Sequence, residues 1–146
     1  MASTILVING PNLNRLGLRE PEIYGRETLD ELNARIQTHA QSRGLKALFF
    51  QSNHEGGLID CLHSYGESKG VILNPGGLAH TSVSLRDAIS SIPIPVIEVH
   101  ISNIFAREPF RHVSFISGAC RGVISGLGTN GYMLAVDHLA SMIPDA

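Results

Sequence analysis

Five short apolar segments alternate with helix-like segments, and this alternation restricts the fold more than any other feature of the sequence. The apolar segments predict strands at residues 4–9, 46–51, 70–74, 96–100 and 122–125. Helices are predicted from residue 28 to residue 44 and at residues 57–66, 82–91 and 130–142. Apolar strands that alternate with helices form a parallel sheet covered on both faces. The sequence therefore predicts an α/β protein, most economically a flavodoxin-like three-layer fold with a five-stranded parallel sheet.

The composition agrees with a single domain over residues 1–146 and argues against several classes of function. Hydrophobic residues make up 43% of the chain and charged residues 16%, as in globular proteins. The formal net charge is -2 and the Lys and Arg residues form no run, so neither a nucleic-acid nor a membrane partner is expected. No apolar stretch reaches the ~18 residues of a membrane span. Cys61 and Cys120 have no metal-ligand spacing, and we expect small buried side chains in a cytoplasmic protein.

Residues 10–27 form a long connection in which Asn, Pro and Gly recur at short intervals. This composition disfavours a regular element, and connections of this length are usually lids or binding loops. We therefore expect a lid at about residues 15–26. The next helix should begin after Thr28, because Thr28 and Glu31 form a capping-box pattern.

Polar residues follow four of the predicted strands at the point where each strand ends. They lie at residues 9–14, 51–55, 74–77 with His80 just beyond, and 100–103. The carboxyl ends of parallel strands share one edge of the sheet, where ligands of this fold class bind. Asn, Gly and Ser are also ordinary turn formers, which is the simpler interpretation of any one of these segments. Four of them at one edge favour a functional site.

The long first connection carries Arg19 and Tyr24, five residues apart. A tyrosine is a poor base near neutral pH because its reference pKa is about 10. A guanidinium nearby favours the phenolate and does not lose its own proton. One loop can therefore carry an activated tyrosine base into the site, although an arginine and a tyrosine in a loop often have no such role.

His100 ends the fourth predicted strand, and Arg107 and Arg111 follow it. A lone histidine at a strand end is usually a core residue, but its place at the proposed edge favours an acid or base. The two arginines can clamp an anionic ligand, or Glu108 can simply neutralise them.

The stretch from Gly126 to Gly131 matches a dinucleotide-binding glycine pattern, but it lies in the last βα unit rather than the first. A tight turn and close helix packing explain these glycines better. The sequence shows no HExxH pattern, no clustered acidic set and no P-loop, so no metal or cofactor is expected.

Taken together, the motifs resemble one family, the type II 3-dehydroquinate dehydratases. The likeness covers essentially the whole chain, with the blocks in the family's order and spacing. The matching blocks are residues 9–14 (NGPNLN), 15–25 (RLGLREPEIYG), 51–56 (QSNHEG), 74–77 (NPGG), 80–87 (HTSVSLRD) and 98–111 (EVHISNIFAREPFR).

The resemblance implies an anti elimination of water from 3-dehydroquinate to 3-dehydroshikimate, through an enolate-like intermediate and without a cofactor. Tyr24 would be the base that takes the C2 proton, and Arg19 would favour its phenolate. Asn12 would help to hold the water that stabilises the enolate. His100 would protonate the departing C1 hydroxyl.

The resemblance also implies how the substrate and other subunits are bound. Asn74, His80 and Arg111 would bind the substrate, with its carboxylate on the backbone amides of Ile101 and Ser102. Arg107 would orient Tyr24. Asp87 would reach the site of a neighbouring subunit, since the family resembles trimers packed into dodecamers.

Other interpretations of the same residues remain. A binding or sensing protein would keep the pocket without catalysis, although Arg19, Tyr24 and His100 are all present. A flavin binder would need a phosphate-binding loop after the first strand, which residues 11–14 do not supply. The same reaction serves either the shikimate pathway or quinate breakdown. Val113 and the pair Cys120 and Arg121 depart from the family pattern, and at Val113 we expect little effect on the chemistry.

Overall fold

Five parallel strands form one sheet in the order β2-β1-β3-β4-β5. The computed structural model describes residues 2–144. The strands are β1 (Ser3–Asn9), β2 (Leu45–Gln51), β3 (Val71–Asn74), β4 (Val96–His100) and β5 (Gly122–Ser125). All the pairings are parallel. This strand order is that of the flavodoxin-like fold, so the predicted architecture is confirmed.

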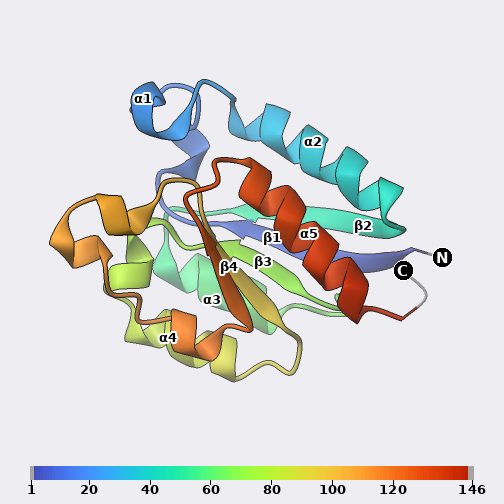
Figure 1. The fold of residues 1–146 in the computed structure, drawn as a ribbon. Coiled ribbons are helices and arrows are strands. Elements are labelled where there is room, and N and C mark those ends of the chain that lie inside the picture. The colour runs from blue at the N-terminus through green and yellow to red at the C-terminus, as the bar shows by residue number, and fades with distance from the viewer. Residues whose placement is uncertain (1, 145–146) are drawn as a thin grey trace.

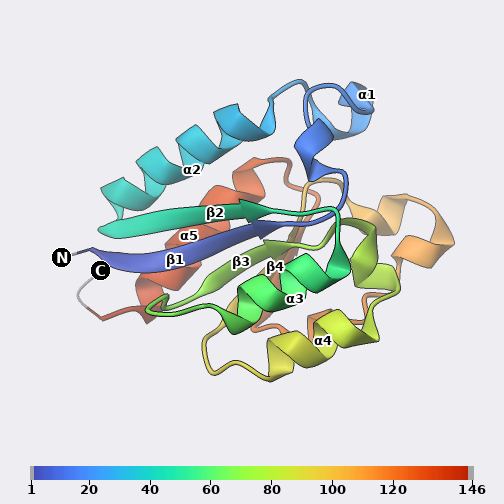
Figure 2. The same cartoon turned by 180° about the vertical axis from the view of Figure 1, so that it is seen from behind.

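Helices cover both faces of the sheet. The helices α2 (Leu29–Ser42) and α5 (Asn130–Met142) lie on one face (Figure 1). The helices α3 (Glu55–His63) and α4 (Val83–Ser90) lie on the other (Figure 2). Successive side chains of a strand point to opposite faces, so β1 contributes to two separate hydrophobic clusters. Ile5 and Val7 pack beneath α2 and α5, whereas Leu6 and Ile8 pack against α3 and α4.

Local sequence signals set the helix boundaries. The capping box at the start of α2 is confirmed: the Thr28 side chain accepts from the Glu31 backbone N–H, and the Glu31 carboxylate accepts from the Thr28 backbone N–H. Ser82 caps α4 by accepting a hydrogen bond from the backbone N–H of Leu85 at 2.8 Å. The prediction was less accurate for α3, which begins and ends earlier than residues 57–66, with His54 rather than Gly57 next to its first turn.

The connection from β1 to α2 is more regular than expected. It contains a 3₁₀ turn (Leu13–Arg15) and the single helical turn α1 (Pro21–Tyr24). Pro21 occupies the first turn of α1, where its missing N–H costs nothing. The prediction that no regular element forms here was therefore wrong in detail. The connection from β4 to β5 likewise contains three 3₁₀ turns, at Ile104–Ala106, Pro109–Arg111 and Ser117–Ala119.

The glycines between β5 and α5 adopt the geometry of a turn. Gly126 and Gly128 have φ angles of 88° and 63°, in the left-handed region that favours glycine. A Cβ atom on Gly131 would lie 3.3 Å from Ile124 and 3.4 Å from Val99, so its absence permits close helix packing. These contacts support the interpretation of this motif as a turn and packing feature.

Within residues 2–144, none of the helices has both the length and the apolar character that crossing a membrane requires.

Candidate active site

A pocket opens at the carboxyl edge of the sheet, where the loops that follow β1, β3 and β4 meet. The space between its lining side chains is about 460 Å³, part of which is open to solvent. Ten of the eleven site residues predicted from the sequence line it: Asn12, Arg19, Tyr24, Asn74, His80, His100, Ile101, Ser102, Arg107 and Arg111. Asp87 is not among them and lies exposed on α4.

The loops that follow β1 and β3 interlock beneath this pocket. The Gly10 N–H donates to the Asn74 carbonyl oxygen at 2.8 Å. A Cβ atom on Gly10 would lie 2.7 Å from the Pro75 carbonyl oxygen, and one on Gly76 would lie 2.9 Å from the Pro11 carbonyl oxygen. Only residues without a Cβ permit this approach, which fixes the two loops relative to each other.

A third loop orients Asn12. The Asn12 backbone N–H donates to the side-chain oxygen of Asn53 at 2.9 Å, and the same oxygen accepts from the Gln51 side-chain amide at 3.1 Å. Asn12 itself has a φ angle of 72°, a left-handed conformation that asparagine adopts more readily than most residues. The loop after β2 therefore fixes the backbone from which the Asn12 side chain enters the pocket.

Two guanidinium groups lie close to the Tyr24 ring. The Cζ atom of Arg19 is 4.6 Å from the centre of the Tyr24 ring, and that of Arg107 is 5.3 Å away. The Nη1 atom of Arg107 donates to the Tyr24 hydroxyl oxygen at 2.7 Å and to the Ser102 hydroxyl at 3.0 Å. A hydrogen bond from a permanent cation favours the phenolate over the phenol. This arrangement suits a tyrosine that must act as a base.

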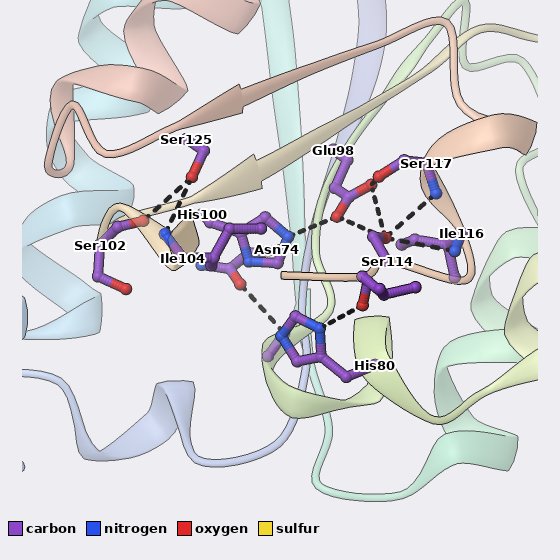
Figure 3. A network of polar contacts seen from close by, with 12 residues as sticks. Asn74, His80, Glu98, His100, Ser102, Ile104, Ser114, Ile116, Ser117 and Ser125 are labelled. Carbon is purple, nitrogen blue, oxygen red and sulfur yellow. Dashed lines mark hydrogen bonds and ion pairs between the residues drawn. The ribbon is translucent and has the colours of Figure 1, made fainter. Parts of the chain in front are cut away.

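His100 is buried and contacts a carboxylate behind the pocket. Its Nε2 atom lies 2.5 Å from the carboxylate of Glu98, the residue two positions earlier on β4 (Figure 3). Its ring also stacks on that of His80, with 6.1 Å between the ring centres and 24° between the planes. Since the carboxylate contacts Nε2, Nε2 carries a proton and Nδ1 is the remaining ring nitrogen available for proton transfer.

Glu98 is fully buried, with none of its surface exposed. The Ser117 hydroxyl donates to one of its oxygens at 2.5 Å, and the Ser114 hydroxyl donates to the other at 3.1 Å (Figure 3). Burial works against the charged form, but the hydrogen bonds from His100 and Ser117 and the charge of His100 outweigh it and hold the pKa of Glu98 below its ordinary value. The carboxylate is therefore ionised at neutral pH and faces the imidazole of His100.

The remaining polar groups are arranged to bind an anion. Arg19, Arg107 and Arg111 line the pocket, and no Asp or Glu does so among the described residues. The backbone N–H groups of Ile101 and Ser102 donate no hydrogen bond to other residues in the part of the chain that the structure describes. Free N–H groups beside guanidinium groups form a binding site for a carboxylate.

Glu108 contacts both arginines of its own loop, as the simpler interpretation of those arginines anticipated. Its carboxylate lies 3.1 Å from Arg111 and 3.7 Å from Arg107. Glu108 is exposed, however, so solvent screens its charge, whereas both arginines extend into the pocket. The pairing orients the two guanidinium groups and leaves them available to a ligand.

His80 is oriented from a distant loop. Its Nδ1 atom lies 2.8 Å from the backbone carbonyl oxygen of Val113. Nδ1 therefore carries the proton in this contact, and Nε2 is left for a ligand. Any residue at position 113 supplies the same carbonyl oxygen, which agrees with the expectation that Val113 has little effect on the chemistry.

Several residues that complete the site were not singled out from the sequence. Glu98 is the clearest case, and a signal for it exists: an acidic residue stands inside an apolar strand, two positions before His100 and so on the same face. Asn53 was only part of a polar segment. Ser114 and Ser117 gave no signal, because their partner Glu98 lies on a different element.

Comparison with known proteins identifies the relatives of this chain. The family model described as "Dehydroquinase class II" matches residues 3–140. A "3-dehydroquinate dehydratase" of Halalkalibacterium halodurans is 60% identical, over 91% of this chain and 92% of its own length. A "Catabolic 3-dehydroquinase 1" of Neosartorya fischeri is 51% identical, over 96% of this chain and 94% of its own.

The solved structures agree with the sequence matches. The crystal structure of a type II dehydroquinase from Propionibacterium acnes superposes with a TM-score of 0.93 at 44% identity, and the match covers 97% of this chain and 98% of the other. Family model, relatives and fold all cover nearly the whole length, so the chain belongs to the class II dehydroquinase family.

Proposed function

We propose that this protein removes water from 3-dehydroquinate to give 3-dehydroshikimate, with Tyr24 as the base and His100 as the acid. The observation that carries the proposal is the Tyr24 hydroxyl, which receives a hydrogen bond from Arg107 at 2.7 Å in the same pocket as His100. The family and its relatives support the reaction. The roles of Tyr24 and His100 are those that the family resemblance implies, and the contacts of the two side chains are compatible with them.

The first step breaks the C2–H bond. The Tyr24 phenolate takes the C2 proton, which is acidic because the C3 ketone accepts the electron pair as an enolate. Arg19 and Arg107 favour the phenolate before the transfer. Asn12 lines the same pocket as Tyr24 and would hold a water molecule against the enolate oxygen.

The second step breaks the C1–O bond. The enolate electron pair forms the C1=C2 double bond, and the C1 hydroxyl leaves as water after His100 donates a proton to it. Glu98 remains ionised behind the imidazolium and so stabilises the charged form of the acid. Proton exchange with solvent then restores the phenolate of Tyr24 and the imidazolium of His100.

Substrate orientation is assigned to groups on three loops. The backbone N–H groups of Ile101 and Ser102 would receive the substrate carboxylate. Asn74, His80 and Arg111 would bind its hydroxyl groups from the other walls.

The connection at about residues 15–26 is proposed to act as a lid that carries Arg19 and Tyr24. Gly17 and Gly25 flank these residues with φ angles of 86° and 84°. Both are conformations that glycine adopts without strain, so these two positions suit hinges.

Assembly and location form part of the same proposal. Asp87 lies outside the pocket of its own chain, and several large apolar side chains are exposed, Phe110 among them at 63%. Both observations support an oligomer in which Asp87 reaches a neighbouring site, in the expected form of trimers packed into a dodecamer. A cytoplasmic location agrees with the unpaired Cys61 and Cys120.

The reaction is tested by following near-ultraviolet absorbance after the purified protein is added to 3-dehydroquinate. A conjugated enone absorbs there and the substrate does not, so the proposal predicts a rise. Treating the protein with borohydride in the presence of 3-dehydroquinate, and removing both before the assay, should leave its rate on fresh substrate unchanged, because no lysine imine takes part. No rise, with calorimetric binding of 3-dehydroquinate intact, would establish a binding protein instead. The assay does not separate a biosynthetic from a catabolic role, since the reaction is the same.

A further inference from the structure

Tyr132 lies in the first turn of α5 and is completely buried, yet its hydroxyl reaches the edge of the sheet where the pocket lies. It contacts two side chains there, the Oδ1 atom of Asn9 at 2.5 Å and the Nδ2 atom of Asn74 at 2.9 Å. Asn9 and Asn74 are the last residues of β1 and β3 and are paired across the two strands. The hydroxyl therefore links a helix to the ends of the two strands.

The direction of each hydrogen bond follows from the groups involved. Tyr132 has one hydroxyl proton, and the Oδ1 atom of Asn9 can only accept, so Tyr132 donates to Asn9. The Tyr132 oxygen then accepts from the Nδ2 atom of Asn74. The Gly76 N–H independently donates to the Oδ1 atom of Asn74 at 3.1 Å. The two hydrogen bonds thus fix the orientation of the Asn74 amide. If the amide were rotated by 180°, its oxygen would face the Tyr132 oxygen and its NH₂ group would face the Gly76 N–H.

The Tyr132 hydroxyl stays protonated because burial raises its pKa. Asn74 is 4% exposed, and it lines the pocket. With one N–H bonded to Tyr132 and one lone pair of Oδ1 bonded to Gly76, the amide keeps one N–H and one lone pair for a ligand. The hydrogen bond to Tyr132 therefore sets the directions in which the free N–H and the free lone pair of Asn74 point.

We infer that Tyr132 is a positioning residue that fixes the side-chain amide of Asn74 for substrate binding. Tyr132 does not line the pocket and would act on the substrate only through Asn74. The inference rests on the proposed substrate-binding role of Asn74. The competing interpretation is a core tyrosine whose hydroxyl is merely satisfied and whose loss affects stability alone.

Kinetics of four variants separate the two interpretations. Tyr132→Phe should raise KM about fivefold to tenfold, the scale of one hydrogen bond, with kcat within about twofold of the wild type. Asn74→Ala should raise KM further, and adding Tyr132→Phe to it should change KM no more. Tyr65→Phe is the matched control, because it removes the same atom from a half-buried tyrosine outside the pocket whose hydroxyl bonds no described residue. Equal KM values for Tyr132→Phe and Tyr65→Phe, or additive effects with Asn74→Ala, would overturn the inference.

A second measurement does not depend on turnover. It separates a positioning role of Tyr132 from a loss of stability in Tyr132→Phe. The side-chain amide signals of Asn74 in a ¹H–¹⁵N NMR spectrum are identified by their absence in Asn74→Ala. They should shift and exchange faster with solvent in Tyr132→Phe, but not in Tyr65→Phe, at a temperature where both variants are folded. Unchanged signals would contradict the positioning role. If wild type and Tyr65→Phe both fail to produce the enone, the proposed function fails, and the NMR result still decides the role of Tyr132.

Discussion

The residues that do the proposed chemistry depend on partners behind the pocket wall. His100 contacts Glu98, and Glu98 accepts hydrogen bonds from Ser114 and Ser117. A buried carboxylate with three donors retains its charge despite desolvation. Glu98 does not line the pocket, so its charge acts on the proposed chemistry through its contact with the imidazole of His100.

Replacing Glu98 by Gln should therefore weaken His100 as an acid. The variant keeps the shape of the side chain and removes its charge, so the imidazolium loses its counter-charge. We expect kcat at neutral pH to fall by about tenfold to a hundredfold. The alkaline limb of the pH–rate profile should move to lower pH, because a protonated His100 is required and is now less favoured. An unshifted profile at reduced kcat would show that Glu98 only shapes the pocket.

At the scale of single residues, sequence patterns found the groups that face the pocket better than those that orient them. Tyr24, Arg19 and His100 stand in turn-rich segments or at a strand end, where function is expected. Tyr132 lies in an ordinary amphipathic helix, and its partner Asn9 is 123 positions away. Nothing local to either residue indicates that contact.

At the scale of elements, the strands were predicted almost to the residue, because each apolar run stops at residues that disfavour strands. The segments 96–100 and 122–125 coincide with β4 and β5. The helical turn α1 was not predicted. Its Tyr24 bonds Arg107, which lies 83 positions further along the chain, so the contacts of this turn are tertiary rather than local.

The interlocking of the loops after β1 and β3 gives a prediction for Gly76. Gly76→Ala adds a Cβ 2.9 Å from a backbone oxygen at a φ angle of 59°, and so should cost about 1–3 kcal/mol of unfolding free energy. The neighbouring Gly77→Ala is the control, because its Cβ would meet nothing within 4 Å. Denaturant unfolding of both variants measures the difference. Equal stabilities would mean that the two loops move apart freely.

At the scale of the whole molecule, the pocket gathers residues from loops after β1, β3 and β4, with the loop after β2 in support. The parallel sheet explains this, since it brings all its carboxyl strand ends to one edge. The location of the site could therefore be predicted from the strand pattern alone. The proposed subunit arrangement could not be predicted in this way, because it depends on surfaces that no periodicity marks.

Asp87 tests that arrangement. Because Asp87 lies outside the pocket of its own chain, Asp87→Ala should lower activity only if the side chain reaches a neighbouring subunit. Asp60→Ala is a matched control on the exposed surface of α3. Light scattering should give a mass well above the 15.7 kDa of one chain. A fully active monomer, with the two variants indistinguishable, would rule out a shared site.

The central claim is that Tyr24 acts as the base, and Tyr24→Phe tests it most directly. The variant keeps the ring near Arg19 and Arg107 and removes only the hydroxyl oxygen. Turnover of 3-dehydroquinate, followed by enone absorbance, should fall roughly a thousandfold, while calorimetry shows nearly unchanged substrate binding. Tyr65→Phe should retain wild-type turnover. If Tyr24→Phe instead loses binding and keeps its kcat, Tyr24 is a binding residue and the proposed mechanism is wrong.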